Sequence, residues 1–155
     1  MEICPGIHRI QTPLGDRFVC LFLLVGEDRT LLLDTGMDQT PGEHLDPYLD
    51  AIDLAPSKIS YVVNSHADFD HTAGNASVRE RCPNALFMCH RLDQPMVEDI
   101  ELMISDRYCE YGPLHGIDES DEAKEFIRSA TRHIPIDVAL SGGEKIRIDA
   151  NWEVE

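Results

Sequence analysis

Two histidines and two aspartates stand within a stretch of six residues, in the segment Asn64-Ser65-His66-Ala67-Asp68-Phe69-Asp70-His71-Thr72-Ala73-Gly74-Asn75. Imidazole nitrogens and carboxylate oxygens are donors for zinc, iron and manganese, and the lack of cysteine among them disfavours a structural, thiolate-rich zinc site. Alternate side chains of an extended loop share a side, so we expect His66, Asp68 and Asp70 to converge and His71 to point elsewhere. Such a loop would supply ligands to two adjacent cations rather than to one.

A polar turn is the structural alternative for the same segment. In such a turn each carboxylate would only accept a hydrogen bond from a backbone N–H group. A single aspartate would be explained in this way. Four donor residues at these spacings, directly after the apolar pair Val62-Val63, favour the metal site instead.

The segments on either side of the motif are the elements that must position it. Residues 59–63 are rich in β-branched and aromatic residues and predict a strand, whereas residues 74–81 predict a helix. Thr40-Pro41-Gly42-Glu43 has the pattern of a capping box, and a helix is expected over residues 47–53. Further strands are predicted over residues 7–12, 18–25, 30–33, 86–88, 138–140, 145–148 and 151–155. Further helices are predicted to begin at Pro95 and in the acidic run 118–122.

Strands come first, helices then alternate with strands, and strands return at the end, which predicts an α/β or α+β domain built in layers. The chain of 155 residues has the length of one domain, and no repeat or Gly/Ser-rich linker divides it. With 43% hydrophobic and 27% charged residues it has a globular composition, which excludes intrinsic disorder.

The motif resembles the H-x-H-x-D-H signature of the metallo-β-lactamase fold superfamily. The resemblance extends to an apolar hairpin that ends in Leu33-Asp34-Thr35-Gly36 and to the strand over residues 59–63. It implies an αββα sandwich, of which this chain supplies roughly the N-terminal β-sheet with its helices. Residues 1–155 would then be a single partial domain, because the family's later ligands (a histidine, a bridging aspartate and a last histidine) would come after Glu155.

The resemblance also implies roles for the individual residues. His66 would be a ligand of the first metal, and Asp70 and His71 would bind the second, with Asp70 also orienting the attacking water as the catalytic residue. Asp34 would brace the motif loop, although by itself it is equally typical of a turn. Asp68 stands where the family usually has its second histidine. The resulting H-x-D-x-D-H pattern approaches the H-x-E-x-D-H of flavodiiron proteins, and the carboxylate makes the first metal site a harder one.

These roles imply a metal-dependent hydrolase with two divalent metal ions, zinc first, with iron or manganese as alternatives. A metal-activated hydroxide would attack an ester, thioester, lactone, β-lactam or phosphodiester bond of a small-molecule substrate. Two other functions remain open at this point: a non-catalytic module that binds a partner through an uncovered sheet, and a di-iron oxidoreductase resembling flavodiiron proteins. The 155 residues alone are expected to bind metal weakly and to lack hydrolytic activity.

The other histidines lack donor-type neighbours at metal spacing. His90 follows a predicted strand, and a surface or capping role is favoured for it over a ligand role. Surface positions are expected for His8, His44, His115 and His133. The pair Met96 and Met103 is expected to pack in a core.

The five cysteines are odd in number and scattered, which favours reduced thiols in a cytoplasmic protein. Cys82 and Cys89, on either side of a short strand, are expected to be inert buried thiols. The segment Met1 to Pro5 has no basic residues before an apolar stretch, so no signal peptide is expected.

Composition limits the partners. Lysine and arginine number 13 against 29 acidic residues, and the formal charge of −16 argues against binding to nucleic acid. The longest apolar run, residues 18–25, is far shorter than the roughly 20 residues of a membrane helix, so no membrane partner is expected. Self-association is expected through an uncovered apolar sheet face made by Phe22, Leu24, Leu31 and Leu33.

Overall fold

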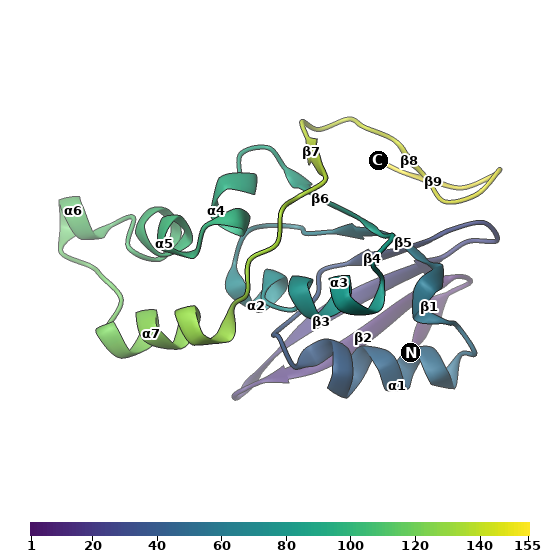
Figure 1. Ribbon diagram of the computed structural model, residues 1–155, viewed down its shortest axis with the longest axis horizontal. Coiled ribbons are helices and arrows are strands. Elements are labelled where there is room, and N and C mark those ends of the chain that lie inside the picture. The colour runs from purple at the N-terminus through teal and green to yellow at the C-terminus, as the bar shows by residue number, and fades with distance from the viewer.

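A seven-stranded sheet in the order β1-β2-β3-β4-β5-β6-β7 lies at the centre of the computed structural model, which describes residues 1–155 (Figure 1). Its strands, with the two of a separate hairpin, are β1 (Glu2–Cys4), β2 (Ile7–Leu14), β3 (Arg17–Val25), β4 (Thr30–Leu33), β5 (Ile59–Val63), β6 (Leu86–His90), β7 (Val138–Leu140), β8 (Ile146–Arg147) and β9 (Glu153–Val154). The α-helices are α1 (Asp46–Ala51), α2 (Phe69–Thr72), α3 (Asn75–Arg81), α4 (Gln94–Glu98), α5 (Ile100–Met103), α6 (Gly112–His115) and α7 (Asp121–Ala130). Shorter helical turns are η1 (Pro41–Leu45), η2 (Pro56–Lys58) and η3 (Ile104–Tyr108). The mixed α/β class predicted from the order of elements is confirmed.

The direction of the strands changes halfway across the sheet. The pairs β1–β2, β2–β3 and β3–β4 are antiparallel, and β3 and β4 form the predicted hairpin, in which Gly26 N donates to Arg29 O over 2.9 Å. Strands β4 to β7 are parallel. Parallel strands end at the same edge of a sheet, so the loops that follow β4, β5 and β6 meet there.

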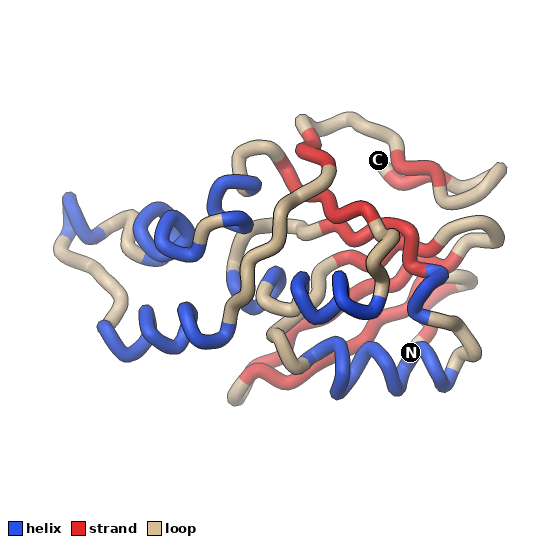
Figure 2. Tube along the Cα trace, viewed as in Figure 1, coloured by secondary structure: helices blue, strands red, loops and turns tan.

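One face of the sheet forms the main core. Side chains of β3 alternate, and Val19, Leu21 and Leu23 are buried on the face that carries α1 and α3. Leu49 of α1 and Val78 of α3 belong to the same apolar cluster. Figure 2 shows these two helices lying along the sheet. The apolar stripe of each helix therefore fixes its position over the sheet.

The opposite face of the sheet is only partly covered. Phe22, Leu24 and Leu33 lie on it and are half-buried, whereas Leu31 is 2% exposed. The β8–β9 hairpin lies over this end of the face, where Ile148 is fully buried and lies against Gly26. The expectation of an open face is therefore wrong for Leu31, because a hairpin distant in sequence folds back over it.

The helix predicted to begin at Pro95 is interrupted. Asp99 is extended, and its carboxylate Oδ1 accepts hydrogen bonds from Glu101 N and Leu102 N, which ends α4 and starts α5. The methionine stripe still packs as expected, since Met103 is buried and Met96 lies against it. The helices α5 to α7 extend to one side of the sheet (Figure 1).

Two further expectations are corrected. Thr40 does not cap a helix: its Oγ1 accepts a hydrogen bond from Met37 N over 3.0 Å, and η1 begins without a side-chain cap. His8 is not a surface residue, because it is 8% exposed and its Nδ1 lies 3.0 Å from the Tyr48 hydroxyl. His8 lies two positions before Ile10 on β2, so the two side chains point to the same, buried face of the sheet. None of the helices has the length and apolar character needed to cross a membrane.

Candidate metal centre

The histidine and aspartate motif lies at the sheet edge where the parallel strands end. The chain leaves β5 at Val63, passes through a short loop and enters the helical turn α2. The residue after β4, Asp34, lies at the same edge, with its backbone N–H donating to Val63 O over 2.8 Å. Ligand sites of open sheets with parallel strands commonly lie at this edge, where loops leave side chains and backbone groups free.

Asp34 is the buried residue that holds the motif together. It is 3% exposed and adopts the left-handed conformation, with φ of 62°, which costs free energy for a residue other than glycine. Its Oδ1 accepts a hydrogen bond from Ser65 N over 2.8 Å. Its Oδ2 accepts two more, from the Ser65 hydroxyl and from His71 Nδ1, each over 2.8 Å. The strained backbone thus aims one carboxylate at two places in the motif.

These hydrogen bonds assign the protons on both imidazoles. His71 donates from Nδ1 to Asp34, which leaves the lone pair of its Nε2 free. The Ser65 hydroxyl donates to Asp34 and so accepts from His66 Nδ1, 2.8 Å away, which frees Nε2 of that ring as well. Histidine ligands of metals are typically fixed in this way by a carboxylate behind the ring. In both rings Nδ1 is therefore engaged, and Nε2 is the nitrogen left for a ligand.

The structure brings all four motif residues together. The rings of His66 and His71 have their centroids 4.1 Å apart, and His71 Nε2 lies 3.8 Å from Asp70 Oδ2. His66 Nε2 lies 3.5 Å from Asp68 Oδ2. The expectation that His71 points elsewhere is wrong, because residues 69–72 form a helical turn rather than an extended loop. Their role as metal ligands stays a prediction.

Asp68 has a strong partner that the sequence does not reveal. Arg107 of η3 donates from Nε to Asp68 Oδ1 over 2.7 Å and from Nη2 to Asp68 Oδ2 over 3.0 Å. The next residue, Tyr108, accepts a hydrogen bond from Phe69 N at its hydroxyl. No three of the histidine, cysteine and acidic side chains surround a common point at metal distance. The donor types suit a divalent metal, but their present arrangement is not a closed coordination shell.

A buried amide pair fixes the two ends of the motif. Asn64 and Asn75 exchange hydrogen bonds between their side chains over 3.1 and 2.8 Å. The Thr35 hydroxyl donates to Asn75 Oδ1 over 2.9 Å. The end of β5 and the start of α3 are therefore tied directly to each other. Sequence reasoning missed these roles, and the only signal was that polar residues directly flank the motif.

The electrostatics of the site act on His71. Burial by itself would lower its pKa, but the hydrogen bond and charge of Asp34, with the charges of Asp70 and Asp68, raise the pKa above the ordinary value of histidine. The buried thiols take no part. Burial raises the pKa of Cys82 to about 11 and that of Cys89 to about 12, which keeps both protonated and inert.

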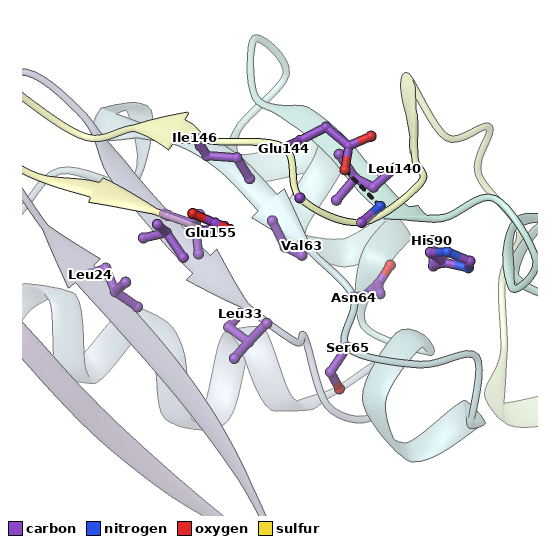
Figure 3. A pocket seen from close by; sticks show the side chains of 14 residues that line it. Leu24, Leu33, Val63, Asn64, Ser65, His90, Leu140, Glu144, Ile146 and Glu155 are labelled. Atoms are coloured by element: carbon purple, nitrogen blue, oxygen red, sulfur yellow. Dashed lines mark hydrogen bonds between the residues drawn. The ribbon is translucent and has the colours of Figure 1, made fainter.

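His90 ends β6 at the same edge but does not join the motif. Its Nδ1 accepts a hydrogen bond from Leu92 N over 3.3 Å, as expected of a capping histidine. Together with Asn64 and Ser65 it borders a cavity of about 400 Å³, between the sheet and the hairpin (Figure 3). The walls of this cavity are otherwise largely apolar, so it is a gap between two sheets rather than the place where the donors meet. Of the other histidines expected at the surface, His115 and His133 are exposed and His44 is half-buried.

Comparisons with known proteins agree with this geometry. The family model described as the metallo-beta-lactamase superfamily matches residues 14–144. No curated protein matches the chain significantly.

Three solved structures show the same fold at low identity. A metallo-beta-lactamase family protein from Thermus thermophilus is 19% identical, with a TM-score of 0.72 over 94% of this chain and 49% of that chain. The FEZ-1 metallo-beta-lactamase from Legionella gormanii is 16% identical, with a TM-score of 0.70 over 94% of this chain and 47% of that chain. A metallo-beta-lactamase with a HARLDQ motif from Cronobacter sakazakii is 16% identical, with a TM-score of 0.70 over 95% of this chain and 49% of that chain. The chain thus spans about half the length of these structures.

Proposed function

Because the chain belongs to the metallo-beta-lactamase superfamily, we propose that it supplies the first group of ligands of a metal-dependent hydrolase. Membership supports a metallo-hydrolase type of function in general. The finer assignment gives His66 and Asp68 to a first metal ion, and Asp70 and His71 to a second. Zinc is the first candidate, and iron and manganese are the alternatives, because imidazole and carboxylate donors suit all three.

The observation that carries this proposal is the hold of Asp34 on two imidazoles. A carboxylate that is buried and strained costs stability, and its three hydrogen bonds all go to Ser65 and His71. A polar turn without a ligand would not need two imidazoles each held at Nδ1. The arrangement resembles the support that metal-binding histidines receive in proteins.

Divalent metal ions, when bound, lower the pKa of water and polarise a carbonyl or phosphoryl oxygen. The residues of this chain would do the positioning. Asp70, which lies beside His71, would accept a hydrogen bond from the attacking water and so fix its direction. Asp34, directly at His71 and through Ser65 at His66, would hold each ring at its Nδ1 and so leave the Nε2 atoms as the nitrogens available to the ions. The substrate would be a small molecule with an ester, thioester, lactone, β-lactam or phosphodiester bond.

Further donors are needed beyond those of these 155 residues. Four candidate ligands shared between two ions leave each ion with about half of a four-coordinate shell. The related structures are about twice as long as the matched region. We therefore place the remaining ligands in a second half of the fold, which would pack on the half-covered sheet face.

The test uses the full-length protein that contains this chain. Metal content is measured by mass spectrometry for the wild type and for the variants His66→Ala, Asp70→Asn and His71→Ala, with His115→Ala as a control at an exposed position. Hydrolysis is assayed on one representative of each of the five bond types. We expect about two metal ions per wild-type chain, loss of metal and activity in the three motif variants, and no change in the control. Full activity of Asp70→Asn, or metal content independent of the motif, would refute the proposal.

A further inference from the structure

The pair between Arg107 and Asp68 joins the motif to a distant helical turn. Both oxygens of Asp68 are engaged, by Nε and Nη2 of the same guanidinium, at 2.7 and 3.0 Å. The side chain of Asp68 is 18% exposed and that of Arg107 is 46% exposed. The pair therefore has the two-point geometry that makes an arginine–carboxylate contact strong and directional, although one partner faces solvent.

Arg107 is also the only lysine or arginine that forms an ion pair with the motif. Three carboxylates lie in this cluster, those of Asp34, Asp68 and Asp70, and their other ion-pair partners are the two histidines. A concentration of negative charge of this kind is stabilised by a nearby cation. In the structure that cation is a guanidinium on the carboxylate that stands at the second ligand position of the motif.

We propose that Arg107 competes with the first metal ion for Asp68 and so sets the affinity of that site. The inference rests on the proposed function, because it takes Asp68 to be a ligand. Asp68 Oδ2 accepts from Arg107 Nη2 over 3.0 Å and also lies 3.5 Å from His66 Nε2, so an ion held between His66 and Asp68 would share this oxygen with the guanidinium. Because two cations then draw on the charge of one carboxylate, binding of the ion should weaken or release the contact of Arg107 with that oxygen.

The surroundings of Arg107 allow this release. Nearly half of its side chain faces solvent, so the guanidinium can move outward without opening the core. Its guanidinium carbon also lies 5.9 Å from the centre of the Tyr108 ring, which offers the guanidinium a cation–π contact as an alternative partner. The Tyr108 hydroxyl would meanwhile keep its hydrogen bond from Phe69 N and hold the motif loop in place.

The test measures zinc affinity rather than activity. Metal-free full-length protein is titrated with Zn²⁺ against a chromophoric chelator, at fixed pH and ionic strength. Removing the competing cation in Arg107→Gln should tighten binding of the first ion by about three- to tenfold, the range expected for a two-point ion pair at a partly exposed site. Arg107→Lys retains the charge but not the two-point contact. Its zinc affinity should lie between that of the wild type and that of Arg107→Gln.

Two further variants separate competition from other effects. Arg128→Gln is the matched control, because Arg128 binds both oxygens of Glu101 in the same way, at 2.6 and 2.8 Å, on exposed helices outside the motif. It should leave zinc affinity unchanged and shift the melting temperature as little as Arg107→Gln does. In an Asp68→Asn background, Arg107→Gln should have no effect on zinc affinity.

The outcomes are distinguishable. Wild-type binding that Arg107→Gln leaves unchanged or weakens would overturn the competition and leave the metal site standing. If Arg107→Gln tightened zinc binding equally in the Asp68→Asn background, the competition would also be overturned. Loss of one positive charge near the site would then explain the tightening without Asp68. No zinc binding by any of the proteins would refute the hydrolase function itself and the competition with it.

Discussion

At the scale of single residues, one buried carboxylate controls the chemistry of the site. Asp34 adopts a conformation that most residues avoid, and its Oδ2 accepts from both Ser65 and His71. The free energy stored in this backbone strain, roughly 1–3 kcal/mol, is offset by three hydrogen bonds to an ionised acceptor. The carboxylate thereby sets the protonation of His71 before any ligand arrives.

The first prediction concerns the titration of His71 in the metal-free protein. Asp34→Asn removes the charge and the acceptor that raise the pKa of His71, so that pKa should fall. Because the folded-state pKa is raised, the stabilisation from this pair is fully present below the ordinary histidine value of about 6.5. It is lost as pH rises through the raised value.

Nuclear magnetic resonance titration of the imidazole carbon-bound protons measures the pKa of His71 in the wild type and in the variant. The wild type should be more stable than Asp34→Asn by a larger margin at acidic than at alkaline pH. Identical pKa values for His71 in the two proteins would show that Asp34 does not govern this ring.

At the scale of elements, the position of the motif depends on how closely α3 approaches the loop after β4. Gly74 N donates to Gly36 O over 2.8 Å, and a Cβ at Gly74 would lie 2.3 Å from Thr35 O. Backbone atoms cannot yield at that distance without moving the loop that carries Asp34. The absence of a side chain at Gly74 therefore lets the helix and the strand end meet.

We predict that Gly74→Ala destabilises the protein and disturbs the motif. Overpacking of this kind typically costs about 1–3 kcal/mol in the free energy of unfolding. Gly112→Ala is the matched control, because a Cβ there meets no atom closer than 3.7 Å, and its change should be near zero or slightly stabilising. Urea denaturation followed by circular dichroism gives both values, and equal stability of the two variants would contradict the steric argument.

At the scale of the whole molecule, a highly acidic chain has one sheet face that is only half covered. The net charge of −16 opposes association, whereas half-buried Phe22, Leu24 and Leu33 favour it. The hairpin covers the end of this face near Leu31 and Gly26 and leaves the cavity beside Val63. An apolar face of this kind normally becomes an interface.

We predict that the 155-residue chain by itself self-associates through this face. Sedimentation velocity at physiological salt should show species larger than the monomer. The double variant Phe22→Thr, Leu24→Thr should shift the distribution toward monomer, because threonine keeps the strand propensity and removes apolar surface. Leu114→Thr, at an exposed position of α6, should not change it. A wild-type chain that stays monomeric at high concentration would exclude this interface.

The sequence alone determined the motif, the strand before it and the helix after it. These features are local: residues 59–63 favour an extended strand by their own side chains, and four donor residues in six positions are visible without any fold. The β-rich apolar run over residues 18–25 likewise predicted the strand β3. Resemblance of the motif to a known family then indicated the layers.

Only the tertiary structure decided which groups contact each other. Arg107 reaches Asp68 across 39 positions of sequence, and Asp34 reaches Ser65 across 31, so no local pattern records either pair. The helical turn at residues 69–72 brought His71 beside His66, against the expectation from an extended loop, because hydrogen bonds to a neighbouring element set that backbone. The types of side chain are known from the sequence. Their partners depend on strand register and helix packing, which bring distant residues into hydrogen-bonding distance.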